Sequence, residues 1–486
     1  MSERHSHSDG PPVSRDEGRR GTEAGIPGSL VEELASRFRG QLIRPGDPGY
    51  EPAREIWNGM IDRHPALVAR CDGDEDVIAA VSFARDNELP LAVRGGGHGV
   101  AGHALCDGGV VIDLSEMMAV DVDPEGLTAR AQGGCRLGDL DRATQRHGLA
   151  TPTGVVSATG IAGLTLSGGM GWLRRKYGLS CDNLVSAKVV TADGTLVAAD
   201  ASENKDLFWA IRGGGGNFGV VTSFEYRLHP IGPEVFFCFV FYPADRAGEV
   251  LRSCERYLSA APDQVGPIAV FGRVPEAEEF PAEWHGEPYV ALLALSPDSP
   301  AEGERALQPL REIAEPICDL SSATTYLEAQ AVLNDDYPDG GRYYWKSVNA
   351  PELSDELIEC LVQHAATAPS RASTIDVWFQ GGAMARVGEE ETAFANRGAA
   401  YLLGIEGNWG DDADSAENVT WVRDTFADLR TYSSGGVYLN FPGFLEEGEQ
   451  LMREGYGVNY ERLSAAKATY DPANLFRLNA NIEPKR

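Results

Sequence analysis

Three glycine clusters constrain this chain most, because they lie close together between residues 95 and 219. The first follows the apolar run 91–93 and reads Arg94-Gly95-Gly96-Gly97-His98-Gly99. Glycines have no side chains, so the backbone N–H groups of such a loop can approach a bound phosphate closely. The loop would also carry His98 to whatever is bound. We therefore expect a nucleotide-type ligand beside an imidazole; a glycine-rich turn with an incidental histidine is the simpler alternative.

The second and third clusters have the same character. The second runs over 159–171 and offers glycines and hydroxyls suited to phosphate or ribityl groups, among them Thr159, Gly160, Gly163, Thr165 and Gly169. It is no Walker A motif, because no Gly-Lys-Ser/Thr ends it, and no clean GxGxxG follows a strand. The third cluster is the run 213–216, which leads to Gly219 and Val220 at the start of an apolar strand. Together the clusters favour a large, cradled cofactor over three unrelated turns.

The charge balance excludes several classes of partner. The chain of 486 residues has 73 acidic and 42 basic residues, for a net charge of -31. Nucleic acid and anionic membrane surfaces would be repelled. A lysine-poor, acidic surface suits a cytoplasm with molar salt, where repulsion is screened within about 3 Å. An acidic protein of an ordinary GC-rich bacterium is the other interpretation.

Cysteine usage and the N-terminus indicate a cytoplasmic protein. The eight cysteines are scattered, with no CxxC and no Cys/His cluster at zinc spacing, so we expect reduced thiols and no metal site. No run of 18 apolar residues is present, so no membrane span is expected. Residues 1–35 are predicted to be a disordered tail, and Arg19-Arg20 lacks the apolar region of a twin-arginine signal.

Short strands, few long helices and glycine loops predict an α+β fold. A helix beginning at Asp74, strands near 91–93 and 109–114, and a hairpin of 184–191 with 195–199 belong to a first domain over 36–230. The stretch 151–171 is expected to be a long loop of small residues. Over 231–430, strand-like runs alternate with helical ones, which predicts an antiparallel sheet with helices on one face. Residues 431–486 are expected to pack back on the first domain.

Longer motifs resemble one flavoprotein family. They are Arg-Gly-Gly-Gly-His98, the block from Ser167 to Leu184, Trp-Ala-Ile-Arg-Gly-Gly-Gly-Gly-Asn-Phe-Gly at 209–219, and the stretch from Asn459 to Arg477. The chain resembles the berberine-bridge-enzyme-like branch of the vanillyl-alcohol-oxidase superfamily over roughly residues 40–486. The resemblance implies a two-lobed, PCMH-type FAD-binding domain, completed by the C-terminal segment, with the substrate domain inserted.

By this resemblance His98 carries FAD on the 8α-methyl carbon of the flavin, a bond that would hold the cofactor and raise its reduction potential. Many relatives form a second bond to a cysteine ten residues before the Ser-Gly-Gly, where this chain has Ser157. One covalent link is therefore predicted. The further cofactor-binding residues predicted are Arg94, His103, Asn440 and Asn481.

The residues expected to take the substrate's proton depart from the family pattern. Relatives use a tyrosine in an Asn-Tyr pair on a C-terminal strand, but here the pair is Asn440-Phe441, and the supporting position on the substrate sheet is Leu402. Removing a proton from an O–H or N–H beside the oxidised carbon still assists hydride transfer. Tyr438, expected on the same strand face as Asn440, is the first candidate; the others are Tyr401, Glu406, Tyr344 and Lys346. Packing in the core or at its rim is the alternative role of each tyrosine.

The resemblance implies an FAD-dependent oxidoreductase that oxidises a small organic substrate, such as an alcohol, a sugar or a secondary metabolite. A hydride would pass to the flavin, which oxygen or another acceptor reoxidises. Gly160 lies where relatives place a branched residue that blocks oxygen, so its small size is compatible with an oxidase. A flavin-binding protein without turnover is one alternative. A pyridine-nucleotide reductase with non-covalent FAD is another, which the His98 motif disfavours.

Overall fold

The first sheet is small and mainly parallel. The computed structural model describes residues 26–486, and its first sheet has the order β1-β2-β4-β3. The helix predicted to begin at Asp74 is confirmed as α3 (Asp74–Asp86). The two predicted strands are confirmed as β3 (Leu91–Arg94) and β4 (Val110–Asp113). The other elements here are β1 (Gln41–Ile43), α2 (Tyr50–Arg54) and β2 (Leu67–Arg70).

Ordered structure begins earlier than the sequence predicted. Helix α1 (Gly28–Ala35) buries Val31 and Leu34 in the same apolar core as Val77 of α3. The prediction of a disordered tail is therefore wrong for residues 28–35, because two apolar side chains one turn apart anchor them. The rest of the predicted tail, residues 1–25, lies outside the described residues.

The second sheet is antiparallel, with the order β5-β6-β10-β8-β9. The predicted hairpin is confirmed, since β8 and β9 pair in antiparallel register. The prediction of a loop over 151–171 is wrong in part: Ile161 and Leu166 are buried in the core of this sheet and hold a short helix, α5. The elements are β5 (Val120–Asp123), β6 (Thr128–Gln132), α4 (Leu137–Gln145), α5 (Ile161–Leu166), α6 (Arg174–Tyr177), β8 (Leu184–Val190), β9 (Leu196–Asp200), α7 (Lys205–Ala210) and β10 (Val220–Arg227).

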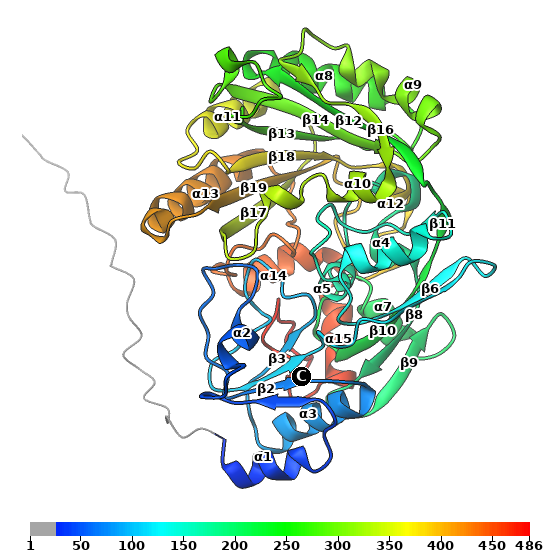
Figure 1. Cartoon of the computed structure of the whole chain (residues 1–486), viewed down its shortest axis with the longest axis vertical. Helices are drawn as coiled ribbons and strands as arrows, with labels where there is room; N and C mark the ends of the chain where they lie inside the picture. The colour runs from blue at the N-terminus through cyan, green and yellow to red at the C-terminus, as the bar shows by residue number, and fades with distance from the viewer. Residues whose placement is uncertain (1–25) are drawn as a thin grey trace, which may run out of the picture.

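The third sheet is large and antiparallel, with the main order β15-β12-β14-β13-β18-β19-β17 and β16 paired to β12. Helices α8, α9, α11 and α13 cover its outer face (Figure 1) and bury a common apolar core against it. The opposite face is free of these helices. The strands are β12 (Glu234–Pro243), β13 (Ile268–Arg273), β14 (Pro288–Ser296), β15 (Cys318–Asp319), β16 (Ser322–Thr325), β17 (Arg342–Ala350), β18 (Thr374–Phe379) and β19 (Tyr401–Trp409). The helices are α8 (Ala247–Leu258), α9 (Pro300–Arg311), α10 (Tyr326–Ala331), α11 (Asp355–Ala366), α12 (Gly382–Arg386) and α13 (Ser415–Leu429).

The C-terminal residues return to the second sheet. Helices α14 (Glu449–Tyr456) and α15 (Tyr460–Tyr470) share the apolar core of that sheet. Lys467 is fully buried, with its Nζ 2.6 Å from Asp471 and 2.8 Å from the carbonyl oxygen of Asn217, just after the third glycine cluster. The pair β7 (Leu149–Ala150) and β11 (His229–Pro230) forms a separate two-stranded ribbon.

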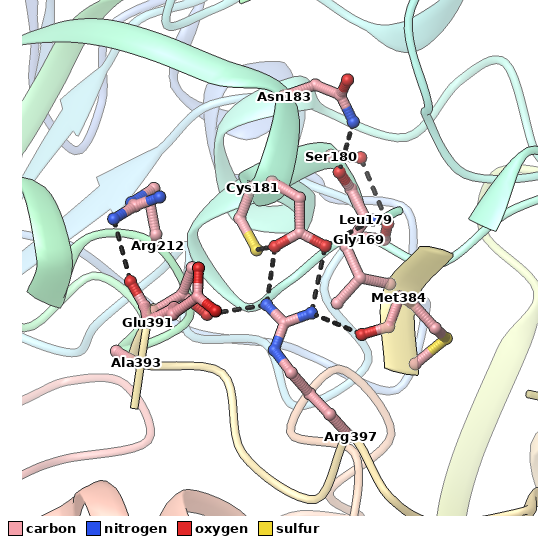
Figure 2. A network of polar contacts seen from close by, with 12 residues as sticks. Gly169, Leu179, Ser180, Cys181, Asn183, Arg212, Met384, Glu391, Ala393 and Arg397 are labelled. Atoms are coloured by element: carbon pink, nitrogen blue, oxygen red, sulfur yellow. Dashed lines mark hydrogen bonds and ion pairs between the residues drawn. The ribbon is translucent and has the colours of Figure 1, made fainter. Parts of the chain in front are cut away.

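A buried ion pair ties the second glycine cluster to the segment before β19. Arg397 donates to both carboxylate oxygens of Asp182, at 2.6 and 3.0 Å, and also to Thr392 Oγ1 and the carbonyl of Met384 (Figure 2). The short turn that carries Asp182 in turn binds the carbonyl oxygens of Gly168 and Gly169. The position of this glycine loop therefore depends on a contact between segments more than 200 residues apart.

Candidate active site

A cavity of about 990 Å³ separates the glycine loops from the uncovered face of the large sheet. Successive residues on a strand point to opposite faces, so alternate residues of each strand reach the cavity. Most of the side chains from the sheet are apolar or aromatic. Those facing the cavity include Phe239, Phe241, Ile268, Val270, Tyr289, Leu293, Trp345, Thr374, Asp376, Trp378, Leu402, Glu406 and Asn408.

Two of the glycine loops touch each other at the cavity wall. A Cβ atom on Gly160 would lie 2.5 Å from the backbone N of Gly96, and one on Gly96 would lie 2.5 Å from the Cα of Gly160. Neither distance is compatible with a side chain. Gly97 and Gly219 have φ of +69° and +150°, which residues with a Cβ rarely adopt. The loops thus present bare backbone to the cavity.

His98 is held against an aromatic stack. Its ring lies 4.0 Å from that of Trp57 at an angle of 13°, and Trp57 stacks on Tyr343 of β17 at 3.7 Å. Within residues 26–486, the buried Nε2 of His98 has no hydrogen-bond partner. Burial lowers the pKa of His98 to about 4, so the imidazole is neutral at physiological pH. A neutral, unpaired ring nitrogen can act as a nucleophile.

Residues far apart in sequence support this stack. Asn58 donates one amide proton to the carbonyl of Val100, beside the His98 loop, and one to the carbonyl of Tyr343. Trp57 Nε1 donates to the carbonyl of Tyr337 at 2.9 Å. The Trp57-Asn58 pair was not among the predicted site residues, because its only sequence signal is an aromatic residue in an irregular stretch.

Most of the predicted cofactor residues line the cavity. These are Gly95, Gly96, Gly97, His98, Gly99, His103, Thr159, Gly160, Gly163, Gly219, Val220 and Asn440. Burial lowers the pKa of His103 to about 4, so this imidazole is also neutral.

Four predicted residues do not line the cavity. Arg94 donates to the carbonyl of Ala53, and Thr165 lies 2.8 Å from the hydroxyl of Tyr226. A Cβ on Gly169 would collide with Ser180, and Asn481 donates to Glu483. Local hydrogen bonds and packing thus hold these four residues outside the cavity lining.

Tyr438 lines the cavity, as predicted for the catalytic candidate, but it does not lie on a strand. Residues 436–441 are irregular, with a single bridge between Lys346 and Pro442, so the expected C-terminal strand is absent. The hydroxyl oxygen accepts hydrogen bonds from Asn440 Nδ2 at 2.8 Å and from the backbone N of Met170 at 3.3 Å. Burial raises the pKa of Tyr438 in spite of these donors.

The other candidates for the catalytic base lie on opposite faces of the large sheet. Tyr401, Tyr344 and Lys346 point to the helix-covered face, where their polar atoms contact Glu255, Glu446 and Glu447 respectively. These three are excluded as bases in the cavity.

Leu402 and Phe441 line the cavity, so the positions that relatives use are apolar here. Among the alternative candidates, only Glu406 brings an acidic group to the cavity face.

Glu406 forms a carboxyl pair with Asp376, a residue that the sequence did not single out. Asp376 is 6% and Glu406 2% exposed, and the two residues lie on adjacent paired strands with both side chains toward the cavity. Glu406 Oε2 accepts from the hydroxyl of Tyr337 at 2.7 Å. Burial raises the pKa of Asp376 to about 7 and raises that of Glu406 well above its usual value. The alternation in β18 could have placed Asp376 on this face, but the neighbouring strand could not be inferred.

Ser157 does not face the cavity. Its Oγ donates to the carbonyl of Gln330 at 3.3 Å, and its backbone N donates to Asn334 Oδ1 at 2.9 Å. The position that carries the second flavin bond in many relatives is thus packed against α10.

Residues 26–486 lack two further kinds of functional feature. No helix there is both long and apolar enough to cross a membrane. The same residues contain no group of three His, Cys, Asp or Glu side chains that could hold a metal ion.

Known proteins share both motifs and fold with this chain. A family model described as "FAD binding domain" matches residues 65–200, and one described as "Berberine and berberine like" matches residues 437–483. An uncharacterized FAD-linked oxidoreductase of Bacillus subtilis is 31% identical, covering 93% of this chain and 98% of its own length. The (R)-6-hydroxynicotine oxidase of Paenarthrobacter nicotinovorans is also 31% identical, over 92% and 97%. The solved structure of 6-hydroxy-D-nicotine oxidase from Arthrobacter nicotinovorans superposes with a TM-score of 0.82 at 30% identity, covering 92% of this chain and 98% of that one.

Proposed function

Since the chain belongs to the berberine-bridge-enzyme-like family of FAD-linked oxidoreductases, we propose that it binds FAD covalently through His98 alone. The observation that carries this proposal is the buried, unpaired Nε2 of His98 at the wall of a cavity whose glycine loops expose backbone. Bound flavin would supply the hydride acceptor. Ser157, turned toward Gln330, supports a single link.

The attachment is tested by acid denaturation of the purified protein, followed by a flavin absorbance spectrum of the pellet. We expect a yellow pellet from the wild type and a colourless one from His98→Ala. His103→Ala is the matched control, because this neighbouring imidazole also lines the cavity; its pellet should stay yellow. Free flavin from the wild type would refute the covalent bond.

We assign the two sides of the cavity to different tasks. Residues 36–230 and 431–486 would hold FAD, and the sheet of 231–430 would bind a small organic substrate. The alternative function, a flavin-binding protein without turnover, is not supported, because the similar proteins are named as oxidoreductases and oxidases. The eight cysteines are all free, in keeping with a cytoplasmic location.

Tyr438 is the group that we propose to take the substrate's proton. Its hydroxyl lies at the cavity, and two N–H donors stabilise the phenolate. Because burial raises its pKa, flavin reduction should accelerate as the pH rises toward 10 and above. This basic limb should disappear in Tyr438→Phe, and its persistence would exclude Tyr438 as the base.

Reoxidation is to be measured by stopped-flow mixing of photoreduced enzyme with air-saturated buffer. We propose oxygen as the acceptor, because one similar protein is named as an oxidase. A Cβ on Gly160 would meet the backbone of Gly96, so the small size of this residue does not bear on oxygen access. Slow reoxidation would instead assign another acceptor, as in a dehydrogenase.

A further inference from the structure

The Asp376–Glu406 pair is the most unusual polar feature of the cavity, and the proposed chemistry does not use it. Asp376 lies on β18 and Glu406 on the adjacent β19, where Glu406 is directly opposite Thr374. Both carboxyl groups face the cavity rather than the helices. One oxygen of the pair, Asp376 Oδ1, is buried without a hydrogen-bond partner in residues 26–486. A buried carboxylate oxygen without a donor is costly unless a ligand supplies one.

Within residues 26–486, no lysine or arginine forms an ion pair with either carboxyl group. Two arginines line the same cavity, but Arg273 donates to the carbonyl of Ala366 and Arg371 pairs with Glu276. The other charged side chains at the cavity are acidic: Asp335, Asp336 and Glu279. These three acids outnumber the two arginines even when the Asp376–Glu406 pair is protonated, so the cavity carries net negative charge. A cationic ligand is the electrostatic complement of such a site.

Aromatic rings surround the pair. Trp345 lies directly opposite Glu406 on the neighbouring strand β17, and Trp378 follows Asp376 on the same face of β18. Tyr337 and Tyr289 also line this part of the cavity. Aromatic faces attract organic cations, most strongly where water is excluded. The remaining cavity face of the sheet is mainly aliphatic or aromatic, with Thr374 and Asn408 among its few polar side chains.

We propose that Asp376 and Glu406 form a subsite for the ammonium group of an amine substrate, with Asp376 Oδ1 accepting one N–H. The apolar body of the amine would pack against Phe239, Phe241 and Ile268 of the same sheet face. This inference rests on the proposed function, because it names the chemical class of substrate for that cavity. An amine carried on an apolar skeleton fits it better than an oligosaccharide.

Proton exchange gives the subsite a signature. The pKa of Asp376 is raised to about 7 by burial, and Asp336, Tyr337 and Tyr289 face the pair without adding positive charge. Because no cation nearby favours the ionised carboxylates, the pair keeps a proton. An arriving ammonium group supplies that positive charge and should displace the proton. Binding of an amine near neutral pH should therefore release protons to the buffer, whereas binding of a neutral alcohol should not.

The test compares phenethylamine with 2-phenylethanol, its neutral counterpart, by isothermal titration calorimetry. The holoenzyme is used with its flavin photoreduced under anaerobic conditions, so that no turnover accompanies binding. We expect the amine to bind at least about tenfold more tightly than the alcohol, since hydrogen bonds to charged groups are the stronger ones. Titrations in buffers of different ionisation enthalpy should report proton release for the amine only.

Variants locate the effect. Asp376→Asn should weaken amine binding by about 10- to 100-fold and leave alcohol binding within about twofold; Glu406→Gln provides a second test. Asp141→Asn is the matched control, because Asp141 is also a buried carboxyl whose pKa burial raises to about 7, but it lies outside the cavity lining. Its amine affinity should equal that of the wild type.

Three results would overturn the subsite: equal affinities of the two probes, no measurable binding of either, or the same loss of both in Asp376→Asn. The acid-denaturation test of the flavin attachment distinguishes failure of the subsite from failure of the proposed function. A yellow pellet without amine preference refutes the subsite alone. Amine preference with a colourless pellet refutes the attachment and leaves the subsite standing.

Discussion

Replacement of Arg397 by methionine is the sharpest test of how the glycine loops are positioned. The Arg397 side chain is 1% exposed and that of Asp182 is 7% exposed, and the guanidinium donates four hydrogen bonds to Asp182, Thr392 and Met384 (Figure 2). Methionine keeps the aliphatic length but leaves the Asp182 carboxylate buried without its cation. No other arginine or lysine forms an ion pair with Asp182 among the described residues.

The expected loss of stability is large, because removing one partner of a buried pair costs about 3–5 kcal/mol. With an unfolding entropy of about 2.1 cal/mol/K per residue, that corresponds in a chain of this size to a fall in melting temperature of roughly 3–5 °C. The Asp182 turn also binds Gly168 and Gly169, so the flavin content of the purified variant should fall as well. The double variant Asp182→Asn/Arg397→Met should recover part of the loss, because no uncompensated charge remains.

Differential scanning calorimetry and the ratio of flavin to protein absorbance measure both effects. Arg371→Met is the control: Arg371 is 66% and its partner Glu276 64% exposed, and such surface pairs contribute about 0–1 kcal/mol. If Arg397→Met were no less stable than Arg371→Met, or if the double variant were less stable than Arg397→Met, the reasoning would be refuted.

Three further predictions follow from individual contacts. Gly160→Ala places a Cβ 2.5 Å from the N of Gly96, so we expect a loss of about 1–3 kcal/mol and a lower flavin content; unchanged urea unfolding would contradict this. His98→Ala/Ser157→Cys should yield a colourless acid pellet, because position 157 faces α10, and retained flavin would show that the cysteine reaches the cofactor. Burial raises the pKa of Asp141 to about 7, so the folded state binds the carboxyl proton more tightly than the unfolded state does. The free energy of unfolding therefore falls as the pH rises from about 4 to about 7. Asp141→Asn should thus be more stable than the wild type above pH 7, by at most about 4 kcal/mol, with no gain near pH 4 in urea unfolding followed by fluorescence.

Local sequence was sufficient for the elements whose signal is local. The acidic start and apolar face of α3 and the Ala-Asp-Gly turn of the 184–199 hairpin predicted those elements with small errors at the ends. Helix α5 was missed because six residues have little helical signal of their own, and buried Ile161 and Leu166 stabilise it through tertiary contacts.

The candidate site shows the same division. Tyr401 and Leu402 are adjacent in sequence, and strand alternation places them on opposite faces of the sheet. Arg94, by contrast, was expected at the cofactor because it adjoins the glycines, but its guanidinium reaches back to Ala53. Adjacency in sequence does not determine the direction of a long side chain, which follows the nearest buried acceptor.

The sequence by itself determined the glycine loops, the histidine that they carry and the family, because each depends on a short run of residues in fixed order. Only the tertiary structure decided what faces that histidine. Trp57, Tyr343 and the Asp376–Glu406 pair come from segments far apart in the chain. A buried aromatic stack holds Trp57 and Tyr343 against His98, and strand register brings the Asp376–Glu406 pair to the cavity that His98 lines. Register depends on which strands become neighbours, a non-local property that the composition and periodicity of a single strand do not contain.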